Sequence, residues 1–150
     1  MIAQSGTGLR LSVWQPVPAD SIIAISSMGS GAAMGDFRRL LAWQVAKELA
    51  IAVYRATTCF PRPEQYGLTS QIRRAAISIC ANIAESCGRY HSADQIRLLR
   101  IALASARELD CELELANELG FMSRSDVETV MALVNRTEAL LVALIRKTRD

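Results

Sequence analysis

The side chains that could carry out catalysis are few and far apart. His91 is the sole histidine, and it lies beside Tyr90 where we predict a turn between helices. A Ser/His/Asp or Cys/His arrangement would have to use it, and a di-iron site in a helix bundle needs a Glu-x-x-His motif on each of two helices. A hydrolase or nuclease using Glu85 and His91 is the one catalytic hypothesis left open. We expect a protein that is not an enzyme.

The four cysteines form no metal or redox motif. They are Cys59, Cys80, Cys87 and Cys111, and none belongs to a C-x-x-C pair. On one helix, Cys80 and Cys87 would lie about 10 Å apart, too far for a disulfide. No glycine-rich phosphate loop is present either. We expect small buried thiols in a reducing cytoplasm, with neither a metal nor a cofactor.

Polar side chains recur at helical spacing between residues 71 and 89. Steps of three and four residues place six of them on one helix face: Gln71, Arg74, Ser78, Asn82, Glu85 and Arg89. We call this row the polar stripe. Alanines flank Ser78 and Asn82, so another helix could approach closely. The alternative is an ordinary solvated face.

A second row follows at residues Ser105, Glu108 and Glu112. If the two rows face each other, Arg74 or Arg89 can pair with Glu108 or Glu112. Buried pairs of this kind add little net stability but can fix register and choice of partner. We therefore predict that the stripe is packed, either within the chain or at a contact between subunits.

Basic residues gather near the predicted helix starts and turns. The chain has a net charge of +2 and a pI of about 8.5, which permits a nucleic-acid partner without demanding one. Arginine dominates, and its planar fork suits phosphate contacts. Charge pairing between subunits is the alternative explanation. Our candidates for nucleic-acid contact are Arg38, Arg39, Arg73, Arg89, Arg97 and Arg100.

The elements that must position these residues are helices. Apolar residues make up 51% of the chain and aromatics only 5%, so Ala, Leu, Ile and Val dominate, as in close-packed helices. Four amphipathic segments are predicted over residues 37–58, 68–87, 92–120 and 125–150. Ser92 and Ser125 each begin a capping-box pattern. Short connections predict an antiparallel up-down-up-down four-helix bundle.

The core stripe of the first helix is predicted from residues that recur at spacings of three and four: Leu40, Trp43, Ala46, Ala50, Val53 and Thr57. No run of about 18 apolar residues is present, so no membrane-spanning helix is expected. A cytoplasmic protein without a membrane partner follows.

Residues 1–35 differ from the bundle predicted over residues 36–150. They contain one Arg, one Asp, two Pro and a run rich in Ser and Gly. Such composition resists helix formation and buries little apolar surface. We predict a flexible leader, and a physiological start at Met28 or Met34.

The segment from Pro61 to Arg89 resembles the four-helix-bundle family that is encoded in intervening sequences of bacterial 23S ribosomal RNA genes. Its features occur in order: Tyr66-Gly67-Leu68, Gln71, Arg73-Arg74, Ser78, Asn82-Ile83-Ala84-Glu85 and Gly88-Arg89. The resemblance extends over about residues 37–144. It departs at Ser86-Cys87-Gly88, where the family commonly has glycine directly after the glutamate.

The resemblance implies a left-handed bundle that assembles into a ring, commonly a homopentamer, with suspected association with RNA or a ribonucleoprotein. A related group of bundle proteins serves diversity-generating retroelements. The alternative is therefore an accessory subunit that binds a reverse transcriptase and contacts RNA through it.

Replacing Asn82 with leucine tests whether the stripe is packed. Because alanines surround this position, we expect Asn82→Leu to disturb assembly more than helix content. Light scattering would report the assembly, and circular dichroism the helix content. An unchanged oligomer would show that the stripe is solvated.

Overall fold

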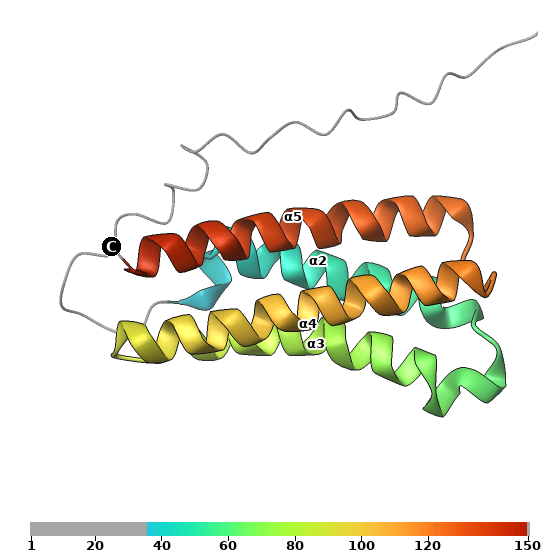
Figure 1. The fold of residues 1–150 in the computed structure, drawn as a ribbon, viewed down its shortest axis with the longest axis horizontal. Coiled ribbons are helices and arrows are strands. Elements are labelled where there is room, and N and C mark those ends of the chain that lie inside the picture. The colour runs from blue at the N-terminus through green and yellow to red at the C-terminus, as the bar shows by residue number, and fades with distance from the viewer. Residues whose placement is uncertain (1–35, 150) are drawn as a thin grey trace, which may run out of the picture.

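Every regular element that the structure describes is a helix. The computed structural model describes residues 36–149, so the predicted leader over residues 1–35 lies outside the described part (Figure 1). The elements in chain order are η1 (Phe37–Arg39), α2 (Leu41–Ala56), η2 (Thr57–Cys59), η3 (Arg62–Tyr66), α3 (Leu68–Ser86), α4 (Ser92–Glu118) and α5 (Arg124–Arg149). The prediction of an all-α chain with four long helices is confirmed.

The four long helices pack around one core. Helix α3 contacts α2 and α4, and α5 contacts α4 and α2, so the first and last helices close the bundle. Leu49, Ile79, Leu109 and Leu141, one from each helix, are fully buried at its centre. Within residues 36–149, no helix combines the length and the apolar character needed to cross a membrane.

The first helix differs from its prediction in bounds and in face. Leu40 has an extended backbone, with φ −72° and ψ 124°, which separates η1 from α2. The buried face is Ala42, Val45, Leu49 and Val53, together with Ala46. Trp43 is only partly buried, and its ring packs edge-on against Phe37 at a centroid distance of 4.9 Å.

Of the six residues of the predicted stripe, Ala46, Val53 and Thr57 are buried as predicted. The other three, Leu40, Trp43 and Ala50, lie at the margin of the core. Both rows obey the helical spacing, so periodicity alone could not separate them.

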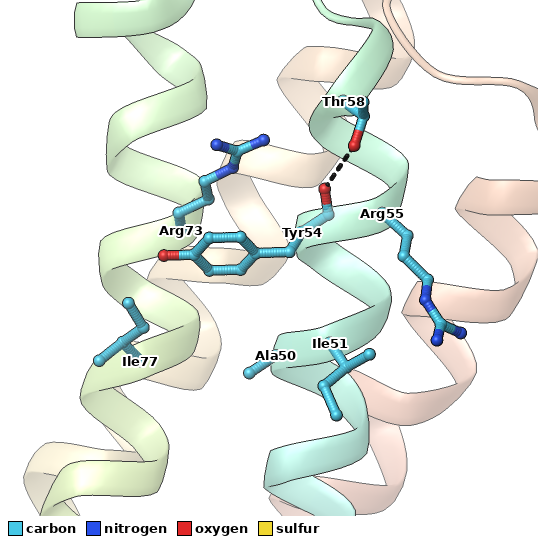
Figure 2. Close-up of a pocket in the computed structure, with 7 residues that line it drawn as sticks. All are labelled: Ala50, Ile51, Tyr54, Arg55, Thr58, Arg73 and Ile77. Carbon is cyan, nitrogen blue, oxygen red and sulfur yellow. Dashed lines mark hydrogen bonds between the residues drawn. The ribbon is translucent and has the colours of Figure 1, made fainter.

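Beyond the end of α2, the Thr58 hydroxyl donates to the Tyr54 carbonyl oxygen at 3.0 Å (Figure 2).

Helix α3 begins and ends within one residue of its predicted bounds. Its first backbone amide, that of Leu68, donates to Glu64 Oε2 at 3.1 Å. A Cβ atom added to Gly67 would lie 2.8 Å from the same oxygen. The glycine therefore leaves room for the carboxylate that caps the helix, which the sequence pattern did not reveal.

The two predicted capping boxes were wrong in position. Helix α4 begins at Ser92 after His91, with no side-chain cap, and Gln95 Nε2 donates instead to the Arg89 carbonyl oxygen at 2.7 Å. At α5 the cap is Ser123 rather than Ser125.

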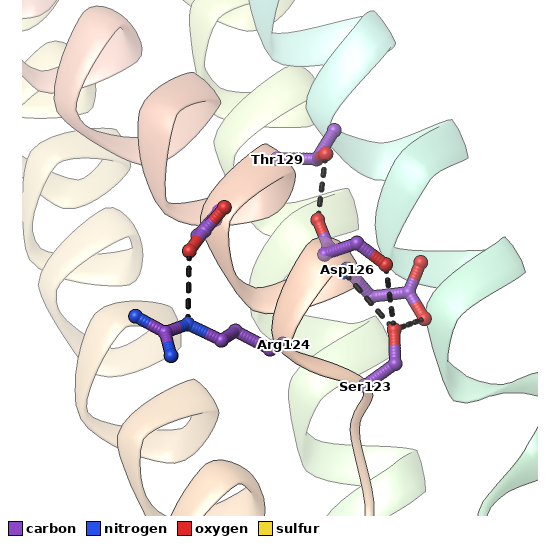
Figure 3. Close-up of polar contacts among 6 residues, drawn as sticks. Ser123, Arg124, Asp126 and Thr129 are labelled. Atoms are coloured by element: carbon purple, nitrogen blue, oxygen red, sulfur yellow. Dashed lines mark hydrogen bonds and ion pairs between the residues drawn. The ribbon is translucent and has the colours of Figure 1, made fainter. Parts of the chain in front are cut away.

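The Ser123 hydroxyl accepts a hydrogen bond from the Asp126 amide at 3.2 Å. It also donates to Asp126 Oδ2 at 2.6 Å (Figure 3). The helix begins one residue earlier than predicted, so Ser125 lies inside the first turn, where its hydroxyl cannot cap.

The predicted stop of α4 at Gly120 is confirmed. Gly120 has φ 71°, a left-handed conformation that favours glycine after a helix end. The amide of Phe121 donates to the Ala116 carbonyl oxygen at 2.9 Å, and that of Gly120 to the Asn117 carbonyl oxygen at the same distance. These bonds satisfy carbonyl groups that the helix end leaves free.

Removing the hydroxyl at the start of α5 should destabilise the bundle. We expect Ser123→Ala to lower the free energy of unfolding by about 1 kcal/mol, since the Asp126 amide loses its acceptor. Urea denaturation followed by circular dichroism measures the change. Ser92→Ala is the matched control and should change stability by less than about 0.5 kcal/mol. Equal losses in the two variants would contradict the assignment of the cap.

Candidate functional site

The two polar rows face each other along the contact between α3 and α4. The hydroxyls of Ser78 and Ser105 share a hydrogen bond of 2.9 Å. Further along, Arg74 Nη2 donates to Glu108 Oε1 at 3.2 Å and to Gln71 Oε1 at 2.6 Å. The pairing of Arg74 with Glu108 that the spacing allowed is therefore present, and it links the two helices.

Burial of the polar stripe changes along its length. Ser105 is buried, and Ser78 and Asn82 are partly buried. Asn82 Nδ2 donates to the Ser78 carbonyl oxygen at 2.8 Å and to its hydroxyl at 3.2 Å, so these bonds stay within α3. The middle of the stripe is therefore at least partly buried against α4.

The ends of the stripe are exposed. Gln71 and Arg74 at one end, and Glu85 and Arg89 at the other, all face solvent. Arg89 pairs with Glu85 on its own side of the turn rather than with a glutamate of α4. Solvent-exposed pairs of this kind contribute little stability. These ends are therefore free to take part in contacts with another molecule.

Glu112 is the residue of the second row whose surroundings are least favourable for a charged carboxylate. It is partly buried, and its Oε2 atom is buried without a hydrogen-bond partner among residues 36–149. The pKa of its carboxyl is raised from 4.5 to about 7, chiefly by burial and next by the charge of Glu108, while Arg74 acts to lower it. The surroundings favour the neutral acid, because a buried carboxylate without partners is costly.

The structure separates Arg73 from the other candidate arginines. Arg73 Nε donates to the Thr57 hydroxyl at 2.8 Å, and its guanidinium lies 4.7 Å from the centre of the Tyr54 ring. By helix rise, Arg73 lies about 20 Å from Ser86 at the end of α3. It therefore belongs to the contact between α2 and α3 rather than to the end of the bundle with the other arginines.

The remaining five candidates lie toward one end of the bundle. Arg38 and Arg39 form part of η1, which contacts α3, and Figure 1 places η1 at the end where α3 gives way to α4. Arg89 lies in the turn that follows α3, and Arg97 and Arg100 lie in the first turns of α4.

Most of these five arginines are available to a ligand. Arg38 pairs with Asp36 at 3.4 Å, and Arg89 pairs with Glu85. Arg39, Arg97 and Arg100 are exposed, and none of the ion pairs found within residues 36–149 involves them. The end of the bundle therefore carries positive charge that the described part of the chain does not neutralise.

A second surface, which the sequence did not reveal, is a groove between α2 and α3. Its lining is largely apolar, and it contains Ala50, Ile51, Tyr54, Arg55, Thr58, Arg73 and Ile77 (Figure 2). The exposed fractions are 44% for Ile51, 43% for Tyr54 and 48% for Ile77. Ile51, Tyr54 and Thr58 recur at spacings of three and four, which was the available signal for a second face on α2.

The cysteines only partly match their prediction as buried thiols. Cys80 and Cys87 are partly buried, but Cys59 and Cys111 are exposed. Burial raises the pKa of the Cys80 thiol to about 11, and it also raises the pKa of the Cys87 thiol. Both thiols are therefore held in the unreactive, protonated form. Within residues 36–149, no three His, Cys, Asp or Glu side chains are grouped to hold a metal ion.

The protein is a four-helix bundle in which the polar stripe faces α4. It also has an exposed apolar groove between α2 and α3 and a basic end. Residues 38–143 match the family model described as 23S rRNA-intervening sequence protein. Since the match spans most of the chain, this protein belongs to the 23S rRNA-intervening sequence protein family.

The solved structures that resemble this chain include one that is similar in both fold and sequence. It is the crystal structure of a protein with unknown function from the S23 ribosomal protein family of Bacteroides thetaiotaomicron. The two sequences are 26% identical, the alignment covers 70% of this chain and 98% of the other, and the TM-score is 0.65. A comparison with curated proteins found no match.

Glu112 should make the stability of the bundle depend on pH. Its pKa is higher in the folded state, so the folded state holds the proton more tightly, and the free energy of unfolding should fall as pH rises from about 4.5 to 7. We expect Glu112→Gln to flatten this fall and to raise stability at pH 8. Denaturant unfolding at several pH values measures it. Glu114→Gln, at an exposed position of the same helix, is the control and should keep the wild-type slope.

Proposed function

We propose that this chain is a non-catalytic subunit of a cytoplasmic homo-oligomer, a pentameric ring of left-handed up-down-up-down bundles, that binds structured RNA or a ribonucleoprotein. The observation that carries the proposal is the basic end of the bundle. Three exposed arginines there, Arg39, Arg97 and Arg100, have no ion pair within residues 36–149. Planar guanidinium groups suit bidentate contacts with phosphates.

Assembly would strengthen this charge. A net charge of +2 per chain is modest, but a ring brings equivalent ends of its subunits to one rim, where their potentials add. Asp36, Glu85 and Asp94 also lie at this end, but they are fewer than its five arginines, and Glu114 and Glu118 lie near the other end of α4. The family description also connects such chains with 23S ribosomal RNA.

Exposed apolar side chains support the oligomer. Ile51, Ile77, Leu115 and Leu119 are each more than 40% exposed, and they come from α2, α3 and the end of α4. Scattered exposed apolar residues are normal on a monomer, whereas contiguous apolar patches mark contact sites. The α2–α3 groove is such a contiguous patch.

A catalytic role finds little support in the geometry. Glu85 is engaged by Arg89, and His91 is an exposed residue that directly precedes α4. The two residues that the catalytic hypothesis required therefore lack the mutual hydrogen bond of a nucleophile and base, or of an acid and base pair. We propose binding rather than catalysis.

Two measurements on the purified full chain test the assembly and the nucleic acid together. Light scattering gives the native mass, and the ratio of absorbance at 260 and 280 nm on the same peak reports bound RNA. We expect a peak near five times the subunit mass of 16.4 kDa, with excess absorbance at 260 nm. A monomer free of nucleic acid would contradict the proposal.

Substitution of the basic end tests the RNA contact directly. We expect the Arg97→Gln, Arg100→Gln double variant to bind structured RNA more weakly. Its affinity should also depend less steeply on salt, by about one unit of slope for each phosphate that an arginine no longer neutralises. Filter binding at several salt concentrations measures both quantities. Arg124→Gln with Arg136→Gln, which alters two exposed arginines of α5, is the matched control. Binding that does not change with salt would refute an RNA-binding end.

A further inference from the structure

The α2–α3 groove is apolar and positively charged. Ile51, Tyr54 and Ile77 supply exposed apolar surface, and Arg73 supplies a guanidinium group, whereas the guanidinium of Arg55 points away from α3 (Figure 2). No carboxylate belongs to the lining that residues 36–149 provide. A ligand that fits this groove should therefore offer apolar side chains together with negative charge.

The charge of Arg73 is held in place. Its hydrogen bond to Thr57 and its position over the Tyr54 ring fix the guanidinium at the wall of the groove. Figure 2 shows the Arg73 side chain beside that ring. A side chain that is already ordered loses less conformational entropy when a partner binds. The groove is thus prepared for an anionic group before the partner arrives.

The same chain carries a surface of matching character near the end of α4. Leu115 and Leu119 are 52% and 59% exposed and lie one turn apart. The exposed glutamates Glu114 and Glu118 flank them. We call these four residues the α4 patch. It offers what the groove lacks, namely apolar side chains with carboxylates beside them.

We infer that the α2–α3 groove of one copy receives the α4 patch of a second copy. The inference rests on the homo-oligomer in the proposed function and specifies its contact. Charge complementarity selects this occupant: two grooves meeting face to face would oppose Arg73 to Arg73, and two α4 patches would oppose glutamates to glutamates. RNA would leave the exposed Ile51 and Ile77 without apolar partners.

The contact joins two different surfaces, so it is heterologous and leaves one groove and one α4 patch unfilled in any open chain of copies. Figure 1 places the end of α2, the start of α3 and the end of α4 at the same end of the bundle. The two surfaces therefore lie at similar heights along the helices. A heterologous contact with little shift along the bundle axis is compatible with a ring, which forms where the rotation between copies closes.

Mixing two defective variants tests this contact. Ile77→Asp places a charge in the groove, and Leu115→Asp places one in the α4 patch. Each variant keeps one intact surface. We expect each to be a monomer of 16.4 kDa by light scattering. A one-to-one mixture should form a dimer of twice that mass and nothing larger, because only one complementary pair of surfaces is then available.

Controls distinguish a broken interface from an unfolded chain. Circular dichroism should show wild-type helix content, since Ile77 and Leu115 are exposed. Ile51→Asp and Leu119→Asp are second variants of the two surfaces and should behave alike. Tyr90→Asp introduces the same charge at a position that is 87% exposed and outside both surfaces, and it should leave the native mass unchanged.

Three results would overturn the inference, and they bear differently on the proposed function. If the variants stay oligomeric, the subunits meet elsewhere and the homo-oligomer survives. If both are monomers but their mixture is too, the two surfaces do not bind each other. If the wild-type chain is itself a monomer, the contact and the proposed ring fail together, while RNA binding by the basic end is judged from its own salt dependence.

Discussion

The bundle depends on the close approach of α3 and α4, which small side chains make possible. Ala76 on α3 and Ala102 and Ala106 on α4 are completely buried between larger residues such as Ile79 and Leu109. Alternation of small and large side chains lets two helices interdigitate at high density. The same closeness brings the hydroxyls of Ser78 and Ser105 together, and so places a polar row beside the apolar core.

Features that depend on one helix face and its neighbour were predictable. The bounds of α3 were predicted to within one residue. The pairing of Arg74 with Glu108 was one of four pairings that the spacing of the two rows allowed, because a helix face is fixed by residue number. The face of α2 was not predictable in the same way, since the row containing Trp43 and the row containing Leu49 are both periodic. The capping serine of α5 was missed by two positions for a similar reason, as Ser123 and Ser125 both suit an N-cap.

Features that need two helices in space were beyond the sequence. The groove combines Ile51 and Tyr54 from α2 with Arg73 and Ile77 from α3, and nothing in either segment alone shows that they share a surface. The same holds for the arginines. Arg73 and Arg74 are adjacent in sequence, yet Arg73 binds Thr57 near α2, whereas Arg74 binds Glu108 on α4. Neighbours along a helix point to different partners, so a cluster in sequence need not be a cluster in space.

The cap on α3 makes two positions interdependent. Any side chain at residue 67 would push aside the Glu64 carboxylate, whose Oε2 lies 2.8 Å from where the Cβ would be, and the Leu68 amide would lose its acceptor. Because Glu64 is a flexible side chain, it can move without disturbing the backbone. The loss of stability caused by Gly67→Ala is then chiefly the loss of this cap. In a chain that already lacks Glu64, the cap is absent, so Gly67→Ala should cost little further stability. These two sites are epistatic, and the effect of changing both is smaller than the sum of the separate effects.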